Sequence, residues 1–180
     1  MAINPFDTEA RIRLSRLYRE YGRDEKAIAL LQQGADQYAV GPTLHLELAA
    51  LYADRGQLET ACSLLDNVRS DYIAKRLSEL RPDNAAAPPS GTYAVGLPFV
   101  LSGGEGFAWY QLNGGPWTMY AAPLALQEGR HKLRVVTLNE QSIPSPVAEY
   151  HYTMETLQPA SASWHMVLCP FCGESWAEAD

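Results

Sequence analysis

Apolar residues in the first eighty positions recur at spacings of three and four, which places them along one side of an α-helix. This pattern predicts helices over about residues 8–21, 25–38, 43–55 and 58–72. A shift of 34 positions superposes nine identical residue pairs: Leu14/Leu48, Leu17/Leu51, Tyr18/Tyr52, Gly22/Gly56, Glu25/Glu59, Ala27/Ala61, Leu30/Leu64, Leu31/Leu65 and Tyr38/Tyr72. A period of about 34 residues is typical of stacked helical hairpins, in which each unit has an apolar face that it cannot bury alone.

The repeated residues follow a large–aromatic–Gly–Ala–large pattern. Its members are Leu14, Tyr18, Gly22, Ala27 and Leu31, and then Leu48, Tyr52, Gly56, Ala61 and Leu65. This pattern resembles the tetratricopeptide repeat (TPR). It departs from the family at Arg11 and His45, where an aromatic residue is common, and at Ala39 and Ile73, where proline is common. The resemblance implies a non-enzymatic adaptor, a scaffold or structural subunit that binds other proteins.

The helical domain is expected to span residues 1–81, with two repeat units. Residues 71–80 keep the helical pattern and either extend the fourth helix or fold back as a cap. Pro82 and the proline- and alanine-rich residues after it predict a linker over 82–91. Two units are fewer than the usual minimum of about three. The open apolar end must therefore be covered by the second domain, by a second copy of the chain or by a partner.

After residue 91 the period changes to the alternation of β-strands. Residues 92–154 predict six or seven short strands, starting with a run over Thr92–Leu101, with a hairpin turn at 113–116. The number and spacing of the strands favour a small β-sandwich. The expected fold class is therefore α+β and multidomain.

Three segments of this second domain resemble the immunoglobulin-like module near the C-terminus of chitobiases and β-hexosaminidases: Trp109–Gly115, Tyr120–Leu124 and Leu126–Val135. Residues 139–146 depart from that family. The resemblance implies a spacer or docking domain without catalytic residues. It also raises an alternative function, that of a carbohydrate-binding or glycosidase-associated accessory protein. Trp109, Trp117 and Tyr120 are interpreted as packing residues rather than as a platform for sugars.

In TPR proteins the first helix of each unit lines an inner groove. When the groove positions of the family are transferred to this chain by register, they fall on Ile12, Arg16, Arg19, Leu46, Ala50 and Ala53. The two arginines are expected to hold a carboxylate of a partner protein while a short apolar side chain contacts Leu46. Alternatively, the acidic tail or the β-domain of the chain itself fills the groove.

Residues 155–163 read as a second linker, and residues 164–180 form a tail that carries Cys169 and Cys172. This Cys-x-x-Cys segment looks like one knuckle of a zinc ribbon. Structural zinc takes four ligands. The set is completed by His165 with another group or by the knuckle of a second copy, which would make a homo-oligomer, or the tail binds no metal. A redox dithiol is a further alternative, although that role requires the first cysteine at a helix N-terminus. The zinc and redox interpretations raise a further alternative function, that of a zinc- or redox-responsive regulator acting through Cys169 and Cys172.

The net charge of −7 is unevenly distributed, because residues 82–180 hold nine acidic and three basic residues. No stripe of basic residues is available to neutralise a phosphate backbone, so nucleic acid is not expected as a partner. No apolar run reaches the roughly 18 residues of a membrane span. The N-terminal residues do not resemble a secretion signal, and a cytoplasmic location is expected. Catalytic triads and phosphate-binding loops are absent from the sequence, which predicts that the protein is not an enzyme.

Overall fold

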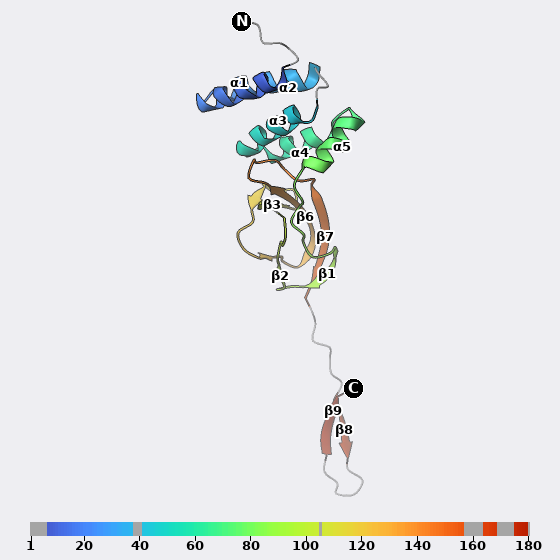
Figure 1. Cartoon of the computed structure of the whole chain (residues 1–180). Helices are drawn as coiled ribbons and strands as arrows, with labels where there is room; N and C mark the ends of the chain where they lie inside the picture. The colour runs from blue at the N-terminus through green and yellow to red at the C-terminus, as the bar shows by residue number, and fades with distance from the viewer. Residues whose placement is uncertain (1–6, 38–40, 105, 157–163, 169–174, 180) are drawn as a thin grey trace.

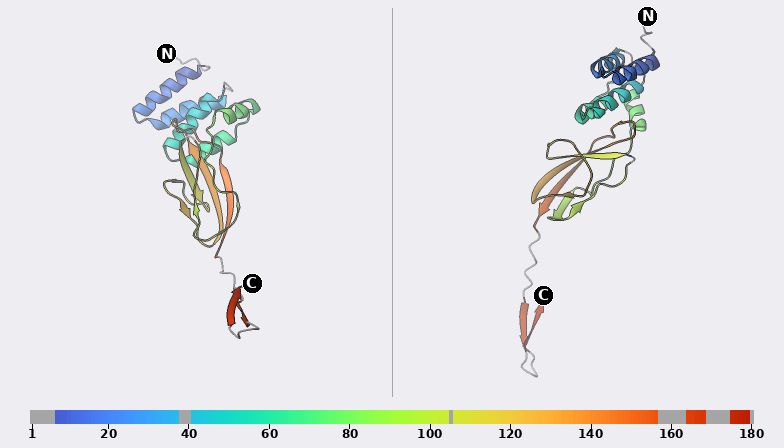
Figure 2. Two further views of the ribbon diagram at one scale, coloured as in Figure 1. Left: turned by 60° about the horizontal axis from the view of Figure 1, so that its bottom comes forward. Right: turned by 90° about the vertical axis from the view of Figure 1, so that its left-hand side faces the viewer.

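The computed structural model describes residues 7–37, 41–104, 106–156, 164–168 and 175–179. Within these residues, helices occupy the N-terminal part and strands the remainder (Figure 1). The views in Figures 1 and 2 both place the helices at one end of the main β-sheet. The arrangement confirms the predicted α+β class at the level of element order.

The helical module contains α1 (Thr8–Glu20), α2 (Asp24–Gln37), α3 (Thr43–Asp54), α4 (Leu58–Asp66) and α5 (Asp71–Leu80). Consecutive helices pack against each other, and α1 also contacts α3. Gly22 and Gly56 lie in the two repeat turns with φ angles of 64° and 75°, a left-handed conformation that glycine adopts without strain. The repeated alanines Ala27 and Ala61 are fully buried, which allows the helices of each hairpin to approach closely.

The fourth helix is shorter than the repeat pattern predicts, because α4 ends at Asp66 rather than near residue 72. The side chain of Asn67 donates a hydrogen bond to the carbonyl oxygen of Ser63 (2.9 Å) at the end of α4. Ser70 then caps α5, where its hydroxyl accepts from the backbone N–H of Ile73. Residues 71–80 therefore form a separate helix and do not extend α4. Local capping of this kind competes with helix continuation.

The β-module contains β1 (Gly91–Ala94), β2 (Pro98–Phe99), β3 (Phe107–Leu112), β4 (Thr118–Met119), β5 (Leu124–Ala125), β6 (Gly129–Leu138) and β7 (Ala148–Glu155). The main sheet has the order β1-β7-β6-β3-β4, and β2 pairs with β5 in a second, two-stranded sheet. All pairs are antiparallel except β1 with β7. The run Thr92–Leu101, predicted from its strand-forming residues, is divided between β1 and β2 by a turn at Gly96, where φ is 93°.

The two faces of β6 belong to different hydrophobic cores. Leu133 and Val135 pack with Phe99 of β2 and with Tyr152 in the core of the β-module. Val136 and Leu138 instead join a cluster of helical residues: Ala49, Ala53, Leu58, Ala61, Cys62, Leu65, Ile73 and Leu77. The open apolar end of the helical module is thus covered by the second domain of the same chain, the first of the three predicted alternatives.

The segment predicted as a linker over 82–91 packs along the sheet instead of spanning solvent. The side chain of Asn84 donates to the carbonyl oxygens of Val135 (2.7 Å) and Pro146 (2.9 Å). The backbone N–H of Ala85 donates to Thr137 Oγ1 (2.8 Å), and Ala85 is buried. The proline- and alanine-rich segment is therefore extended, and hydrogen bonds from Asn84 and Ala85 hold it against the sheet.

The tail contributes β8 (Trp164–Leu168) and β9 (Ser175–Ala179), which pair antiparallel. His165 lies in β8 opposite Glu178 of β9. Cys169, Cys172 and most of the second predicted linker lie outside the described residues. Among the described residues, no helix is both long and apolar enough to cross a membrane.

We expect Leu77→Ala to lower the free energy of unfolding by about 2–5 kcal/mol, because this side chain is 1% exposed in the cluster shared by the two modules. Urea unfolding can be followed by far-UV circular dichroism and by tryptophan fluorescence. The transition midpoints from both signals should move to lower urea concentration together, since Trp109 and Trp117 pack against the same cluster. Leu80→Ala, on the same helix but 44% exposed, is the matched control and should change stability by less than about 0.5 kcal/mol. A shift in the circular dichroism alone would contradict a shared core.

Candidate functional site

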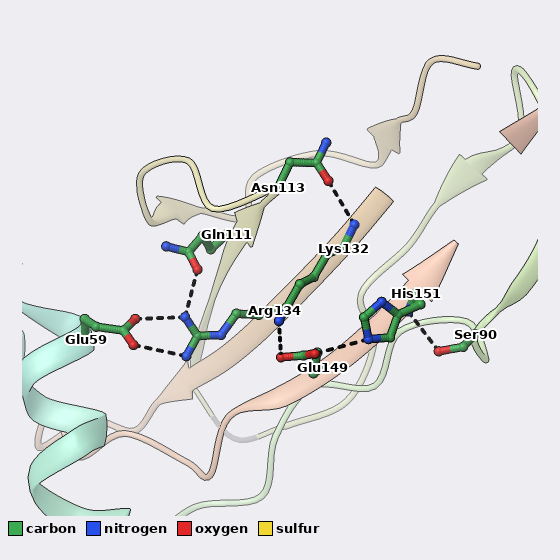
Figure 3. A network of polar contacts seen from close by, with 8 residues as sticks. All are labelled: Glu59, Ser90, Gln111, Asn113, Lys132, Arg134, Glu149 and His151. Atoms are coloured by element: carbon green, nitrogen blue, oxygen red, sulfur yellow. Dashed lines mark hydrogen bonds and ion pairs between the residues drawn. The ribbon is translucent and has the colours of Figure 1, made fainter. Parts of the chain in front are cut away.

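A polar network joins α4 of the helical module to β6 of the β-module. Arg134 of β6 contacts Glu59 of α4 in a two-pronged ion pair, with Nη1–Oε2 at 2.9 Å and Nη2–Oε1 at 3.2 Å (Figure 3). Gln111 Oε1 accepts a further hydrogen bond from Arg134 Nη1 (2.9 Å). Trp117 Nε1 donates to Glu59 at 3.3 Å, and the Arg134 guanidinium lies 5.4 Å from the Trp117 ring centroid. The planar guanidinium therefore fixes the orientation of the helices relative to the sheet.

The surroundings of Glu59 favour its ionised form. The hydrogen bond from Arg134 lowers the pKa of the Glu59 carboxyl below its ordinary value of 4.5, against the opposing effect of burial, and the contact with Trp117 lowers it further. The ion pair is thus present at neutral pH. Glu59 occupies the same position in the second repeat unit that Glu25 occupies in the first.

A second connection links the end of α5 to the loop between β6 and β7. The side chain of Arg81 is 5% exposed and donates from Nε to the carbonyl oxygen of Pro144 (3.0 Å) and from Nη2 to that of Ser145 (2.6 Å). Its Nη1 contacts Asp66 at 2.5 Å. Within the loop, Asn139 Oδ1 accepts from the backbone N–H groups of residues 141 and 143. These contacts attach the β6–β7 loop to the helical module.

A cavity of about 320 Å³ lies between the helices and this loop. Its lining comprises Arg16 and Arg19 of α1, Thr43, Leu46, Glu47 and Ala50 of α3, and Gln141 and Ile143 of the loop. Four of the six residues predicted for the groove, Arg16, Arg19, Leu46 and Ala50, are brought together here. A contribution of the β-domain to the groove was one of the alternatives, but none of the loop residues that form this wall was predicted, because the repeat pattern contains no information about residues in another domain.

The other two predicted groove residues do not line the cavity. Ile12 is 5% exposed and packs with Leu31 and Leu48 in the core between the first two hairpins. Ala53 is 7% exposed and belongs to the cluster that contains Val136 of β6. The register transfer fails at these positions because neighbouring helices cover Ile12 and the β-module covers the end of α3 that carries Ala53.

The groove arginines are paired within the chain, which the sequence did not predict. Arg16 contacts Glu47, and Arg19 contacts Asp54, both on α3. Each of these contacts uses the Nη2 atom of the arginine. Because a guanidinium carries five N–H donors, the remaining donors can still reach an acceptor in the cavity. The cavity therefore offers donors, the acceptor oxygens of Glu47 and a short apolar surface.

The tryptophans of the β-module are packing residues. Trp109 and Trp117 pack against the cluster shared by the two modules, and Tyr120 packs against the core between the two sheets.

Metal and thiol chemistry have no assembled site in the described part of the chain. No group of three or more His, Cys, Asp or Glu side chains there is placed to hold a metal ion. Cys62 is buried in the shared cluster, and burial raises the pKa of its thiol to about 11. This thiol is protonated at neutral pH, which agrees with a packing role.

Comparisons of the chain with protein-family models, with curated proteins and with solved structures gave no match.

We expect Glu59→Gln to lower the free energy of unfolding by about 1 kcal/mol at neutral pH. This value is at the upper end of the contributions that exposed ion pairs make to stability. Because the folded-state pKa lies below the ordinary value of 4.5, the contribution of Glu59 is complete above that pH. It is lost as the pH falls through the folded-state pKa, so the difference between variant and wild type should shrink on acidification. Urea unfolding at a series of pH values measures this.

Glu25→Gln is the matched control for this prediction. Glu25 occupies the same repeat position but contacts Arg55 within the helical module and is 80% exposed at its side chain. The control should change stability less than Glu59→Gln does at neutral pH. An equal effect of both substitutions, or a difference for Glu59→Gln that is independent of pH, would contradict the assigned role of the Glu59–Arg134 pair.

Proposed function

We propose that this chain is a non-enzymatic adaptor that binds a segment of another protein in the cavity between α1, α3 and the β6–β7 loop. The observation that carries this proposal is the joint lining of that cavity by both modules, at four of the positions expected to line a groove. The chain would act as a docking subunit of a larger assembly.

The chemistry of the lining specifies the kind of segment. Arg16 and Arg19 present guanidinium donors at one side, and Leu46, Ala50 and Ile143 present an apolar surface. A carboxylate next to a short apolar side chain is complementary to this pair of surfaces. The volume of about 320 Å³ is at the lower end for small-molecule pockets and suits one or two side chains of a peptide.

The rigidity of the joint supports a binding role. Arg81 and the Asn139 side chain fix the β6–β7 loop before any partner arrives. A preformed wall reduces the conformational entropy that is lost on binding. Ile143 is therefore held in place for contact with a partner.

We expect the double variant Arg16→Ala/Arg19→Ala to weaken the binding of peptides selected on the full-length wild-type chain by at least about tenfold. The reason is that each lost hydrogen bond to a charged group costs about 1.5–3 kcal/mol. Peptides are selected from a random display library, synthesised, and titrated against each protein by isothermal calorimetry. Selection should enrich segments with an acidic residue near a short apolar one.

The control for this experiment is Arg13→Ala/Arg23→Ala. Arg13 lies on α1, Arg23 follows it in the first repeat turn, and both are exposed and absent from the cavity lining. Its affinity should equal that of the wild type. If the selected peptides bind the cavity variant as tightly as the control, their site lies elsewhere and the proposed groove is wrong.

A second candidate function, zinc binding by the tail, is favoured by the pairing of β8 with β9. Leu168 lies opposite Ser175, so the segment with Cys169 and Cys172 connects two paired antiparallel strands. A zinc-ribbon knuckle joins strands in this way. Because one knuckle supplies two thiolates, we propose that two chains share one ion or that His165 contributes to the set.

We expect the full chain, purified with zinc present, to retain roughly one zinc ion per two chains if two knuckles make a four-thiolate site. Elemental analysis with native mass spectrometry measures both the metal content and the number of chains. The variant Cys169→Ser/Cys172→Ser should lose the metal, whereas Cys62→Ala, which removes a buried cysteine of the shared cluster, should keep it. Metal-free wild-type protein would rule out this second function.

A further inference from the structure

The basic residues of the acidic C-terminal half are gathered on one strand. Residues 82–180 contain three basic residues, and these are Arg130, Lys132 and Arg134. They occupy alternate positions of β6, so their side chains share one face of the main sheet. Three basic residues distributed at random over the surface would not be expected to lie on one face of one strand.

The helices cover only one end of this face. Arg134 is engaged by Glu59, whereas the side chain of Lys132 is 48% exposed and Arg130 is exposed. On the neighbouring strand β7, His151 lies opposite Lys132, and Thr153 lies opposite Arg130. Residues two apart on a strand are separated by roughly 7 Å, and partners across a ladder by roughly 5 Å. Arg130 and Lys132 therefore form a compact cationic cluster beside His151 at the uncovered end of the sheet.

Positive charge in this cluster is only partly neutralised. Lys132 Nζ lies 2.8 Å from Glu149 Oε2, and His151 Nε2 lies 3.1 Å from Glu149 Oε1 (Figure 3). The backbone of Arg130 pairs with Thr153 across the ladder, but its guanidinium has no ion-pair or hydrogen-bond partner among the residues that the structure describes. Glu149 thus contacts both Lys132 and His151, and the guanidinium of Arg130 is available to bind a ligand.

A cavity of about 390 Å³ lies beside these groups, lined by Arg130, Lys132 and His151 together with Asn113, Thr92 and Thr153 among others. Asn113 is fixed there by its own contacts, because its Oδ1 accepts from the backbone N–H of Lys132 (2.9 Å). The backbone N–H of His151 is likewise bonded to Ser90 Oγ (2.9 Å). The cationic side chains therefore extend from a backbone that is held in place on both strands.

We propose that this cluster binds a phosphomonoester group. A phosphate dianion carries three terminal oxygens, which match a two-pronged contact with Arg130 and a point contact with Lys132. The same chemistry occurs in a phosphorylated small molecule and in a phosphorylated side chain of a protein. This site is separate from the groove between the modules and does not depend on the adaptor function.

Calorimetric titration of the full chain with phenyl phosphate and with a short phosphoserine peptide tests the proposal. We expect both probes to bind, and acetate and the unphosphorylated peptide to bind at least about tenfold more weakly at the same ionic strength. Tighter binding of the peptide would point to a protein as the source of the phosphate, and tighter binding of phenyl phosphate to a small molecule. Failure of both phosphorylated probes to bind would overturn the proposal.

Substitutions locate the site. Arg130→Ala and Lys132→Gln should each weaken the binding of phenyl phosphate by about tenfold or more, and Arg130→Lys should restore part of the affinity because it keeps the charge. Arg23→Ala, another exposed arginine, should leave the affinity unchanged. Circular dichroism verifies that each variant is folded. Equal affinities of Arg130→Ala, Arg23→Ala and the wild type would show that phosphate binds elsewhere or by charge alone, and would also overturn the proposal.

Discussion

Burial of the helical module's open end against β6 is the contact on which the remaining structure depends. Two helical hairpins leave an apolar flank, and Val136 and Leu138 cover it. The opposite face of the same strand supplies Leu133 and Val135 to the core between the sheets. A strand that is buried on both faces loses simple alternation and becomes nearly continuously apolar. One strand thus belongs to two cores, and neither module has a complete core without it.

Apolar contact alone does not fix an orientation, because it has no preferred direction. The polar groups at the edge of the shared cluster supply that direction. Arg134 reaches Glu59 with two hydrogen bonds and lies against Trp117, while Arg81 reaches two carbonyl oxygens of the β6–β7 loop. These contacts place the loop beside α1 and α3. The cavity between the modules is therefore a consequence of how the joint is oriented.

The parts of the fold that depend on local sequence were predictable, and those that depend on distant contacts were not. Helix positions and the turns at Gly22 and Gly56 follow from periodicity and backbone preference, which act over a few residues. The pairing of Glu59 with Arg134 joins positions 75 residues apart, so no spacing rule indicates it. A signal was nevertheless present: residues 133–138 contain apolar neighbours that one buried face cannot accommodate. Half of the apolar residues in that run needed a partner outside the β-module.

The two candidate binding surfaces differ in what they require, and β6 explains the difference. The cavity at the Leu138 end has walls from both modules, so it exists only while the joint is intact. The cationic cluster at the Arg130 end and the cavity beside it are built from β6, β7, β1 and Asn113 after β3, so they need only the β-module. A strand of ten residues spans roughly 30 Å, which is enough for both surfaces to be occupied together. Because Arg134 lies between the two surfaces and is held by Glu59, ligands bound at both of the proposed sites would be kept at a fixed separation along β6.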